Sequence, residues 1–267
     1  RRPCLRTGLA YPGSRGRCHR LLSRTTWCGK NFEAIKVGSF LMELKDVARN
    51  YDQASRWYDL FTKFLFDGIL RLGKYRELVL DRLGNIEGSR VLEVGCGTGL
   101  NFSHILPRIK SDGELVGLDY SCGMLEKAST KIQTNEWENV VLVKDDAAKL
   151  ENVDGEFDAI VAYWCYGIVH DLESALEKAL ESLASGGRIA ILDFHRTYPE
   201  KAMLRWLYPI YRRLLIAAKI DSPQDLDNDR LQRKWSGAKE FLRSRLRNYR
   251  EEEYLWGTGL LISGENP

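Results

Sequence analysis

The feature that most limits how this chain can fold is a glycine-rich turn between a short apolar strand and a helix. Residues 90–94 (RVLEV) form an apolar run, glycines follow at Gly95, Gly97 and Gly99, and a helical pattern begins near Leu100. Glycine lets the chain turn sharply at the end of a strand and brings the backbone close to a ligand. In this strand-to-helix context, the turn predicts a βα unit that binds a ligand.

The alternation of strand and helix continues along the chain. Two helical segments are expected first, at 44–66 and 68–83, followed by strands at 90–94, 114–119, 140–144, 157–163 and 188–194, with helices at 100–109, 123–133 and 171–184. Apolar strands separated by helices predict a parallel sheet covered on both faces, which right-handed crossovers make doubly wound. Short strands at 249–256 and 258–263 predict a final antiparallel hairpin, which completes an α/β fold with a mostly parallel seven-stranded sheet.

Residues near the glycine turn discriminate between nucleotide ligands. A dinucleotide fingerprint has the spacing G-x-G-x-x-G, but here Leu100 stands where its last glycine would be. Glu93, directly before the turn, disfavours a pyrophosphate and favours an ammonium group. Asp119 closes the second strand, 20 residues after Gly99, where a carboxylate can accept hydrogen bonds from ribose hydroxyls. A ligand with a ribose, an ammonium group and no phosphate is S-adenosylmethionine.

Several motifs together resemble the class I S-adenosylmethionine-dependent methyltransferases. They are EVGCGTG at 93–99, GLDYSCGML at 117–125, KDDAAKL at 144–150, FDAIVA at 157–162 and SGGRIAILDF at 185–194. The resemblance extends over residues 45–264. It implies the Rossmann-like methyltransferase fold, S-adenosylmethionine as the cofactor and methyl transfer as the activity.

The resemblance also implies a role for each matched position around the glycine turn. Gly95, Gly97 and Gly99 are expected to line the methionine and ribose part of the cofactor. Glu93 is expected near the amino group, and Asp119 at the ribose hydroxyls.

The adenine and methyl ends of the cofactor have expected contacts as well. Tyr120 and Met124 would flank the adenine, Asp146 and Ala147 would contact its edge, and Ala162 would lie beside the reacting methyl group. Two of these residues have plain alternatives. Met124 also suits the core side of a helix, and Asp146 also suits a turn at a strand end.

The paired motif Tyr51-Asp52 and Tyr58-Asp59 resembles the entry segment of ubiquinone/menaquinone C-methyltransferases and of bacterial phospholipid N-methyltransferases. In those families the first helices fold over the cofactor. Tyr58 is therefore expected in the cofactor site, where an aromatic ring attracts the sulfonium cation. The resemblance implies a hydrophobic small-molecule acceptor, either a quinone precursor or a lipid head group. Both tyrosines alternatively suit half-buried helix positions.

Candidate catalytic residues follow the fourth and fifth strands. Carbon and oxygen acceptors need a general base, for which His170 is the best placed histidine and His195 the second. Tyr163, expected beside the reacting methyl group, and Tyr166 border the same rim and are expected to form an acceptor wall with catalytic roles. Either histidine alternatively is a hydrogen-bonded loop residue.

The segment at 201–219 has an apolar surface with one narrow basic stripe. On a helix, Lys201, Arg205, Arg212 and Lys219 fall within about 40° of one another. This pattern is typical of a lid over an apolar acceptor or of a helix on an anionic membrane surface, which predicts peripheral membrane contact. A core-covering helix with a solvated stripe remains an alternative.

The net charge of +3 hides two differently charged parts. Nine of the 40 basic residues and one of the 37 acidic residues lie in 1–41, which leaves 42–267 with a net charge of −5. Residues 1–41 are expected to be a disordered extension or a leader, and 42–267 the methyltransferase domain. The body lacks the basic face expected of a nucleic-acid-binding protein.

The cysteines bear on the cellular compartment and on metal binding. Those of the body are scattered singly, which favours a reducing, cytoplasmic compartment, whereas a basic leader used as a transit peptide indicates an organelle. Cys4, Cys18, Cys28 and His19 match no usual zinc spacing, so no metal site is expected.

Two other functional classes remain open from the sequence. A nicotinamide-dependent oxidoreductase would share the strand-to-helix turn, although Leu100 and Glu93 disfavour it. A methyltransferase-like protein that binds without catalysis would retain the same glycines and Asp119.

Overall fold

The expected alternation of strand and helix is present in the computed structural model, which describes residues 73–196, 213 and 228–267. The expected helix at 44–66, the Tyr51–Tyr58 motif, the 201–219 segment and the boundary near residue 41 lie outside these residues. All the described residues belong to one unit, Ile35–Pro267. Within them, no helix is long and apolar enough to cross a bilayer.

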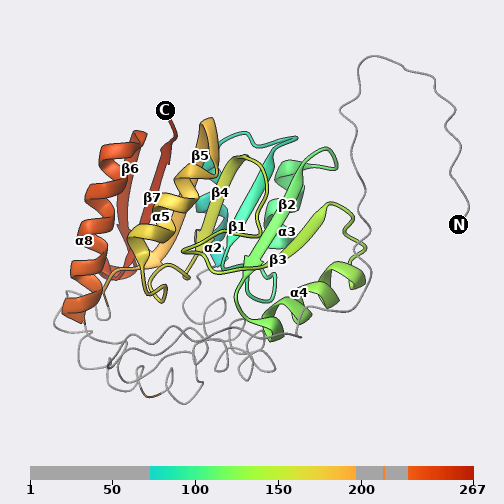
Figure 1. Ribbon diagram of the computed structural model, residues 1–267, viewed down its shortest axis with the longest axis horizontal. Helices are drawn as coiled ribbons and strands as arrows, with labels where there is room; N and C mark the ends of the chain where they lie inside the picture. Colours follow the sequence, from blue (N-terminus) through green and yellow to red (C-terminus); the bar gives the residue numbers. More distant parts are fainter. Residues whose placement is uncertain (1–72, 197–212, 214–227) are drawn as a thin grey trace, which may run out of the picture. The chain divides into compact units, whose positions relative to one another are not determined.

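Seven strands of the described part form one sheet in the order β3-β2-β1-β4-β5-β7-β6 (Figure 1). The strands are β1 (Arg90–Val94), β2 (Glu114–Asp119), β3 (Val140–Lys144), β4 (Phe157–Tyr163), β5 (Leu183–Phe194), β6 (Arg247–Tyr254) and β7 (Gly259–Glu265). The helices are α2 (Gly73–Leu83), α3 (Phe102–Ile109), α4 (Cys122–Thr134), α5 (Leu172–Glu181) and α8 (Asn228–Arg245), and a short 3₁₀ turn, η2 (Leu255–Gly257), joins β6 to β7.

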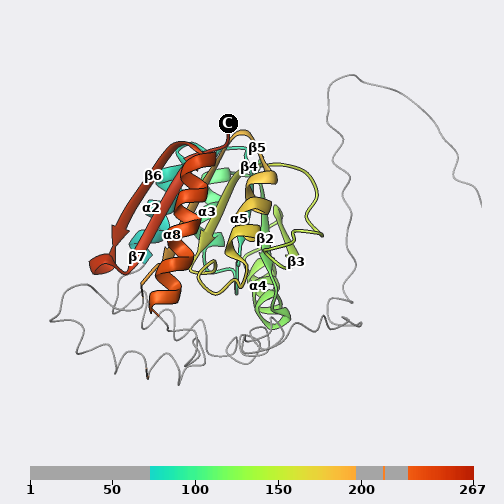
Figure 2. The ribbon, with the colours of Figure 1, turned by 60° about the vertical axis from the view of Figure 1, so that its left-hand side comes forward.

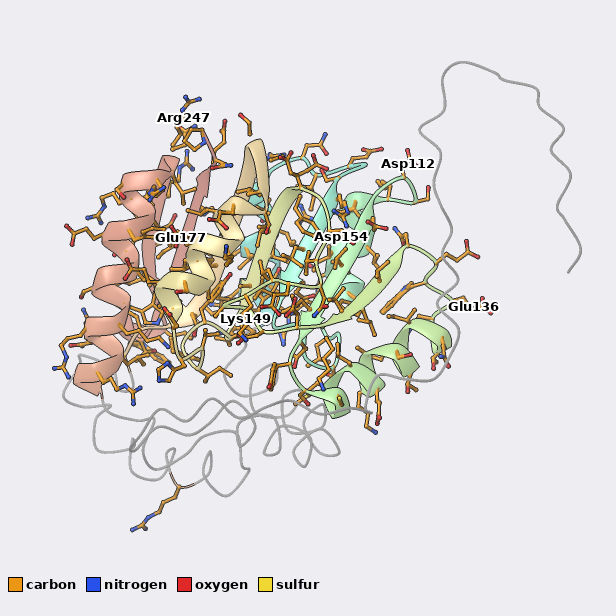
Figure 3. The ribbon with its side chains drawn as sticks, in the orientation of Figure 1. Asp112, Glu136, Lys149, Asp154, Glu177 and Arg247 are labelled. Carbon is orange, nitrogen blue, oxygen red and sulfur yellow. The ribbon has the colours of Figure 1, made fainter. Side chains whose placement is uncertain are left out.

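The directions of the strands define two edges of the sheet. β1 to β5 run parallel, and β7 is inserted antiparallel between β5 and β6. The expected mostly parallel sheet with a C-terminal antiparallel hairpin is therefore confirmed. In Figure 3, Asp112 and Arg247 mark the edge where parallel strands begin, and Lys149 lies toward the edge where they end. Ligands of doubly wound sheets bind at that carboxyl edge, where the strand order reverses between β1 and β4.

Helices cover both faces of the sheet (Figure 2). α2, α3 and α4 enclose one apolar layer, and α5 and α8 enclose the other. Neighbouring residues of β1 alternate between the layers, with Val91 in the first and Leu92 in the second. Burial on both faces explains why the central strands β1, β2 and β4 are mostly apolar.

Element boundaries differ most from the expectation near β5. The sequence predicts a helix to residue 184 and a strand from 188, but α5 ends at Glu181 and β5 begins at Leu183. The tail of the chain explains this difference, because Gly186 N–H donates to the Asn266 carbonyl at 2.9 Å and Asn266 N–H donates to the Gly187 carbonyl at 2.8 Å. These distant partners extend the strand where local sequence predicts a turn.

Helix α8 is absent from the sequence-based prediction. Its buried residues are Trp235, Ala238 and Leu242, at positions i, i+3 and i+7, and the rest of the helix is rich in charged residues. This narrow apolar stripe is a genuine helical pattern, but its charged surroundings obscure it in a sequence scan.

Candidate functional site

The glycine turn after β1 adopts the backbone conformation that its sequence predicts. Gly95, Gly97 and Gly99 have φ angles of 68°, 55° and 73°, in the left-handed region that favours glycine. A Cβ atom on Gly95 would lie 2.4 Å from the Cβ atom of Cys165, whereas a Cβ atom on Gly97 would meet no atom of the described residues within 4 Å. Gly95 is thus needed for packing, and Gly97 leaves open space at the carboxyl edge.

Asp119, at the end of β2, joins the glycine turn to the next helix. Its Oδ2 atom accepts a hydrogen bond from Gly97 N–H at 2.8 Å, and its Oδ1 atom accepts one from Ser121 N–H at 2.8 Å. Ser121 in turn caps α4, because its Oγ atom accepts from Met124 N–H at 3.1 Å. Carboxylate oxygens accept hydrogen bonds from hydroxyl groups, so Asp119 at this edge is a residue of the type that binds a diol.

Glu93 lies beneath the turn with its side chain fully buried. Its Oε1 atom accepts a hydrogen bond from Asn101 Nδ2 at 2.5 Å, while its Oε2 atom is buried without a hydrogen-bond partner in the described part of the chain. Burial raises the pKa of Glu93 to about 8, although the Asn101 hydrogen bond and the Arg76 charge oppose the rise and the Asp119 charge adds to it. A cationic group against Oε2 would therefore be strongly favoured.

A lysine that the sequence analysis missed braces the glycine turn from α4. Lys131 Nζ donates to the Thr98 carbonyl oxygen at 2.8 Å and to its Oγ1 atom at 3.1 Å. Asn101 and the buried Arg76 were missed as well. Asn101 is a polar residue directly after the glycine turn, and this position is a signal that could have identified it. Arg76 and Lys131 come from other elements and offered no such signal.

The loop after β3 is fixed by its own aspartates. Asp145 N–H donates to the Asp119 carbonyl oxygen at 3.2 Å, which ties this loop to β2. The carboxylate of Asp145 accepts hydrogen bonds from the N–H groups of Asp146 (2.7 Å) and Asn152 (2.6 Å). Asp146 Oδ1 accepts from Ala148 N–H at 3.0 Å, in a side-chain turn that leaves its other oxygen for a further donor.

The remaining expected cofactor contacts lie on neighbouring elements. Met124 is buried in the first turn of α4, Tyr120 is half-buried just before that helix, and Ala147 is half-buried in the loop after β3. Ala162 is buried near the end of β4. The structure thus places the β2, β3 and β4 candidates along one edge of the sheet, while Tyr58 lies outside the described residues.

The three expected catalytic residues do not converge on one point. Tyr163 packs in the layer with α2, where its hydroxyl donates to the Arg76 carbonyl oxygen at 3.4 Å. Tyr166 is fully buried in the opposite layer, and His170 is exposed. Burial raises the pKa of both tyrosines well above the usual value, so each hydroxyl keeps its proton at neutral pH.

His195, the second candidate base, braces the turn between β6 and β7. Its Nε2 atom lies 3.0 Å from the Gly257 carbonyl oxygen, and its backbone N–H donates to the Thr258 carbonyl oxygen at 3.0 Å. Because a carbonyl oxygen only accepts, Nε2 carries the proton in this contact. Burial also lowers the pKa of His195.

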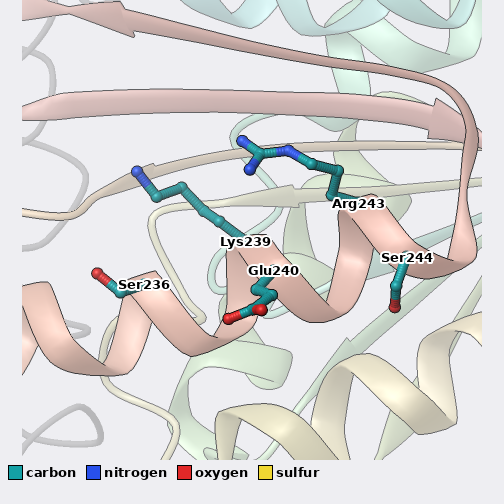
Figure 4. Close-up of a pocket in the computed structure, with 5 residues that line it drawn as sticks. All are labelled: Ser236, Lys239, Glu240, Arg243 and Ser244. Atoms are coloured by element: carbon teal, nitrogen blue, oxygen red, sulfur yellow. The ribbon is translucent and has the colours of Figure 1, made fainter.

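A groove on the surface of α8 is a separate feature (Figure 4). Its lining residues are Ser236, Lys239, Glu240, Arg243 and Ser244. Lys239 Nζ and Arg243 Nη2 pair with Glu251 of β6, at 2.8 and 3.0 Å. The groove therefore lies over the C-terminal hairpin, while the glycine turn and Asp119 follow β1 and β2.

Comparison with known proteins places this site in a family. Residues 91–187 match the family described as "Methyltransferase domain". The chain is 30% identical over 192 residues to a ubiquinone/menaquinone biosynthesis C-methyltransferase from Idiomarina loihiensis, which covers 68% of this chain and 73% of that protein. It is also 29% identical to a demethylmenaquinone methyltransferase from Renibacterium salmoninarum, over 62% of this chain and 65% of that protein, a little under two thirds of its length.

Solved structures share the fold. An S-adenosylmethionine-dependent methyltransferase from Aquifex aeolicus superposes with a TM-score of 0.55 at 18% identity, covering 81% of this chain and 98% of that one. The N-methyltransferase NodS from Bradyrhizobium japonicum, in complex with S-adenosylhomocysteine, superposes with a TM-score of 0.52 at 15% identity, covering 82% and 98%. At these identities the similarity concerns the fold alone.

Proposed function

Because the chain belongs to the class I S-adenosylmethionine-dependent methyltransferases, we propose that it transfers a methyl group from S-adenosylmethionine to a hydrophobic small molecule. A quinone precursor is the first candidate acceptor, and a lipid head group is the second. The names of the Idiomarina and Renibacterium relatives support the quinone class.

The observation that carries the proposal is the buried Oε2 atom of Glu93, which has no hydrogen-bond partner in the described part of the chain. The α-ammonium group of S-adenosylmethionine is a cation of the kind this atom would bind. Among the described residues, the space at Gly97 is open to a ligand that approaches the backbone, and the carboxylate of Asp119 next to it is of the type that binds ribose hydroxyls. These residues fit S-adenosylmethionine, whereas a pyrophosphate would be repelled by the Asp119 carboxylate and would offer no cation to Glu93.

The sulfonium of the bound cofactor supplies an electrophilic methyl group. The protein's own contribution is to hold both reactants in line and to exclude water. Glu93 and Asp119 would fix the two ends of the methionine–ribose part, and the brace from Lys131 keeps the turn between them in place. The loop after β4 borders the same edge and is the expected acceptor side, with His170 the candidate base.

Calorimetry with S-adenosylmethionine and with NAD tests the cofactor. We expect S-adenosylmethionine to bind and Asp119→Ala to weaken its binding at least about tenfold, since charge-assisted hydrogen bonds contribute about 1.5–3 kcal/mol each. Asp112→Ala is the matched control, because Asp112 is an exposed aspartate at the opposite edge of the sheet. Full affinity in Asp119→Ala, or tighter binding of NAD, would contradict the proposal.

The acceptor is tested with radiolabelled S-adenosylmethionine. Purified protein is incubated separately with demethylated quinone precursors and with a total phospholipid extract, and the labelled products are identified. Transfer to the quinone precursors is the expected result. Label in phospholipid alone would favour the second acceptor class, and cofactor binding without transfer to either would indicate a different acceptor or a binding protein.

A further inference from the structure

The loop at 164–170, which follows β4, is held on one side by a buried carboxylate. Asp193 is 3% exposed near the end of β5. Its Oδ2 atom accepts a hydrogen bond from Gly167 N–H at 2.9 Å, and its Oδ1 atom accepts one from Phe194 N–H at 2.7 Å. The carboxylate thus links the middle of the loop to the strand beside β4.

A lysine from α8 holds the carbonyl groups of the same loop. Lys234 Nζ donates to the carbonyl oxygens of Tyr166 at 3.2 Å and Gly167 at 2.8 Å, and also to that of Val169. An ammonium group has three donors, and within the described residues Lys234 makes contacts with three carbonyl groups of this one loop. Asp193 and Lys234 therefore hold the N–H and C=O groups of the loop from different elements.

The loop begins with a backbone conformation that needs such support. Trp164 has a φ angle of 52°, in the left-handed region that bulky residues adopt only when their surroundings impose it. Its N–H donates to the Leu192 carbonyl oxygen at 2.7 Å. This turn places Tyr163 and Tyr166 in opposite layers and leaves Ile168 exposed at the loop surface.

We propose that Asp193 and Lys234 are positioning residues, which hold the loop at 164–170 in the shape that the acceptor requires. The inference rests on the proposed function, in which this loop forms the acceptor side. Burial raises the pKa of Asp193 to about 6, while the hydrogen bonds from Gly167 and Phe194 and the Lys234 charge oppose the rise. The side chain is accordingly mostly ionised at pH 7, and its two oxygens accept from the two N–H groups.

Lys234→Met tests the lysine, because it removes the donors and retains an unbranched side chain. The matched control is Arg233→Met, which removes an exposed cation from the adjacent position of α8. Amide hydrogen exchange of the loop is measured in the ligand-free protein, followed by the acceptor KM, kcat and the cofactor Kd. We expect Lys234→Met to accelerate loop exchange and raise the acceptor KM about tenfold or more, because hydrogen bonds to charged groups are lost, with the cofactor Kd within about twofold.

Asp193→Asn provides a second variant that preserves shape and removes the charge. It should accelerate exchange at Gly167 and raise the acceptor KM in the same direction, and Arg233→Met should match the wild type. Unchanged loop exchange in both variants would overturn the proposal, and so would faster exchange with unaltered acceptor KM and kcat. Wild-type protein that binds S-adenosylmethionine but methylates neither acceptor class would contradict the proposed function, while loop exchange would still decide whether these residues fix the loop.

Discussion

At the scale of single residues, Glu93 shows how burial couples charge to ligand binding. Its pKa of about 8 in the ligand-free protein lies far above the usual 4.5. Because the pKa of Glu93 is higher in the folded protein than in the unfolded chain, protonation of this side chain favours folding. Its contribution to the free energy of unfolding is therefore complete below about pH 4.5 and is lost as the pH rises to about 8. At pH 7 the ligand-free side chain is therefore mostly protonated, and binding of an ammonium group should release its proton.

Glu93→Gln should accordingly change stability and binding in opposite directions. The free energy of unfolding of the ligand-free protein should increase by about 1 kcal/mol or more at pH 8 and by much less at pH 5, because the variant carries no buried charge. Affinity for S-adenosylmethionine should fall about tenfold, since the ammonium group loses its counterion. Urea denaturation and calorimetry measure the two quantities, and calorimetry in buffers of different ionisation enthalpy should show proton release in the wild type alone.

The control for this variant is Glu87→Gln, at an exposed position after α2. It should leave stability, affinity and proton release unchanged. If Glu93→Gln lowered stability at pH 8 and retained wild-type affinity, Glu93 would be a structural residue without a role in cofactor binding.

At the scale of elements, two glycines of the same turn have different roles, Gly95 in packing and Gly97 in ligand access. Gly97→Ala adds a methyl group where no described atom lies within 4 Å. The free energy of unfolding should therefore fall only by the roughly 1–2 kcal/mol that an alanine costs in the left-handed conformation. The added methyl group should nevertheless obstruct the cofactor. Gly88→Ala is the matched control, because Gly88 has a φ angle of 72° and open space of its own, away from the turn. Thermal unfolding should show similar losses in both variants, and cofactor affinity should fall in Gly97→Ala alone.

Gly95→Ala completes this comparison. Its Cβ atom would lie 2.4 Å from that of Cys165, so stability should fall by more than in the other two variants. Equal cofactor affinity in Gly97→Ala and Gly88→Ala would show that the space at Gly97 is not used by the cofactor.

The same elements show what the sequence can predict. The β1 turn was predictable because the glycines that shape it are contiguous with the strand and helix that it joins. The start of β5 was not, because Asn266, 82 residues after Ala184, supplies part of its pairing. Lys234 offered no signal either, since it binds backbone carbonyl groups, which every residue has. Contacts between distant elements thus account for the positioning residues that pattern analysis missed.

At the scale of the whole molecule, the order of the strands places the cofactor candidates of β1 and β2 away from the C-terminal hairpin of β6 and β7. The described residues assigned to the cofactor lie in or after β1 to β4, whereas α8 holds the acceptor-side loop through Lys234 and His195 contacts the turn between β6 and β7. The candidate tyrosines, although close in sequence, were not brought together, because the turn at Trp164 places them in opposite layers.

The charge asymmetry of the full chain leads to a final prediction. Deletion of residues 1–41 removes nine basic residues and one acidic residue. It should leave the affinity for S-adenosylmethionine within about twofold of the wild type, because the residues assigned to the cofactor, from Tyr58 to Ala162, all lie outside the deleted segment. Flotation with anionic vesicles should persist in the truncated protein and weaken when Lys201, Arg205 and Arg212 are replaced by Glu, since the basic stripe at 201–219 would make the contact. Loss of flotation on truncation, with no effect of the triple substitution, would instead assign membrane attraction to the first 41 residues.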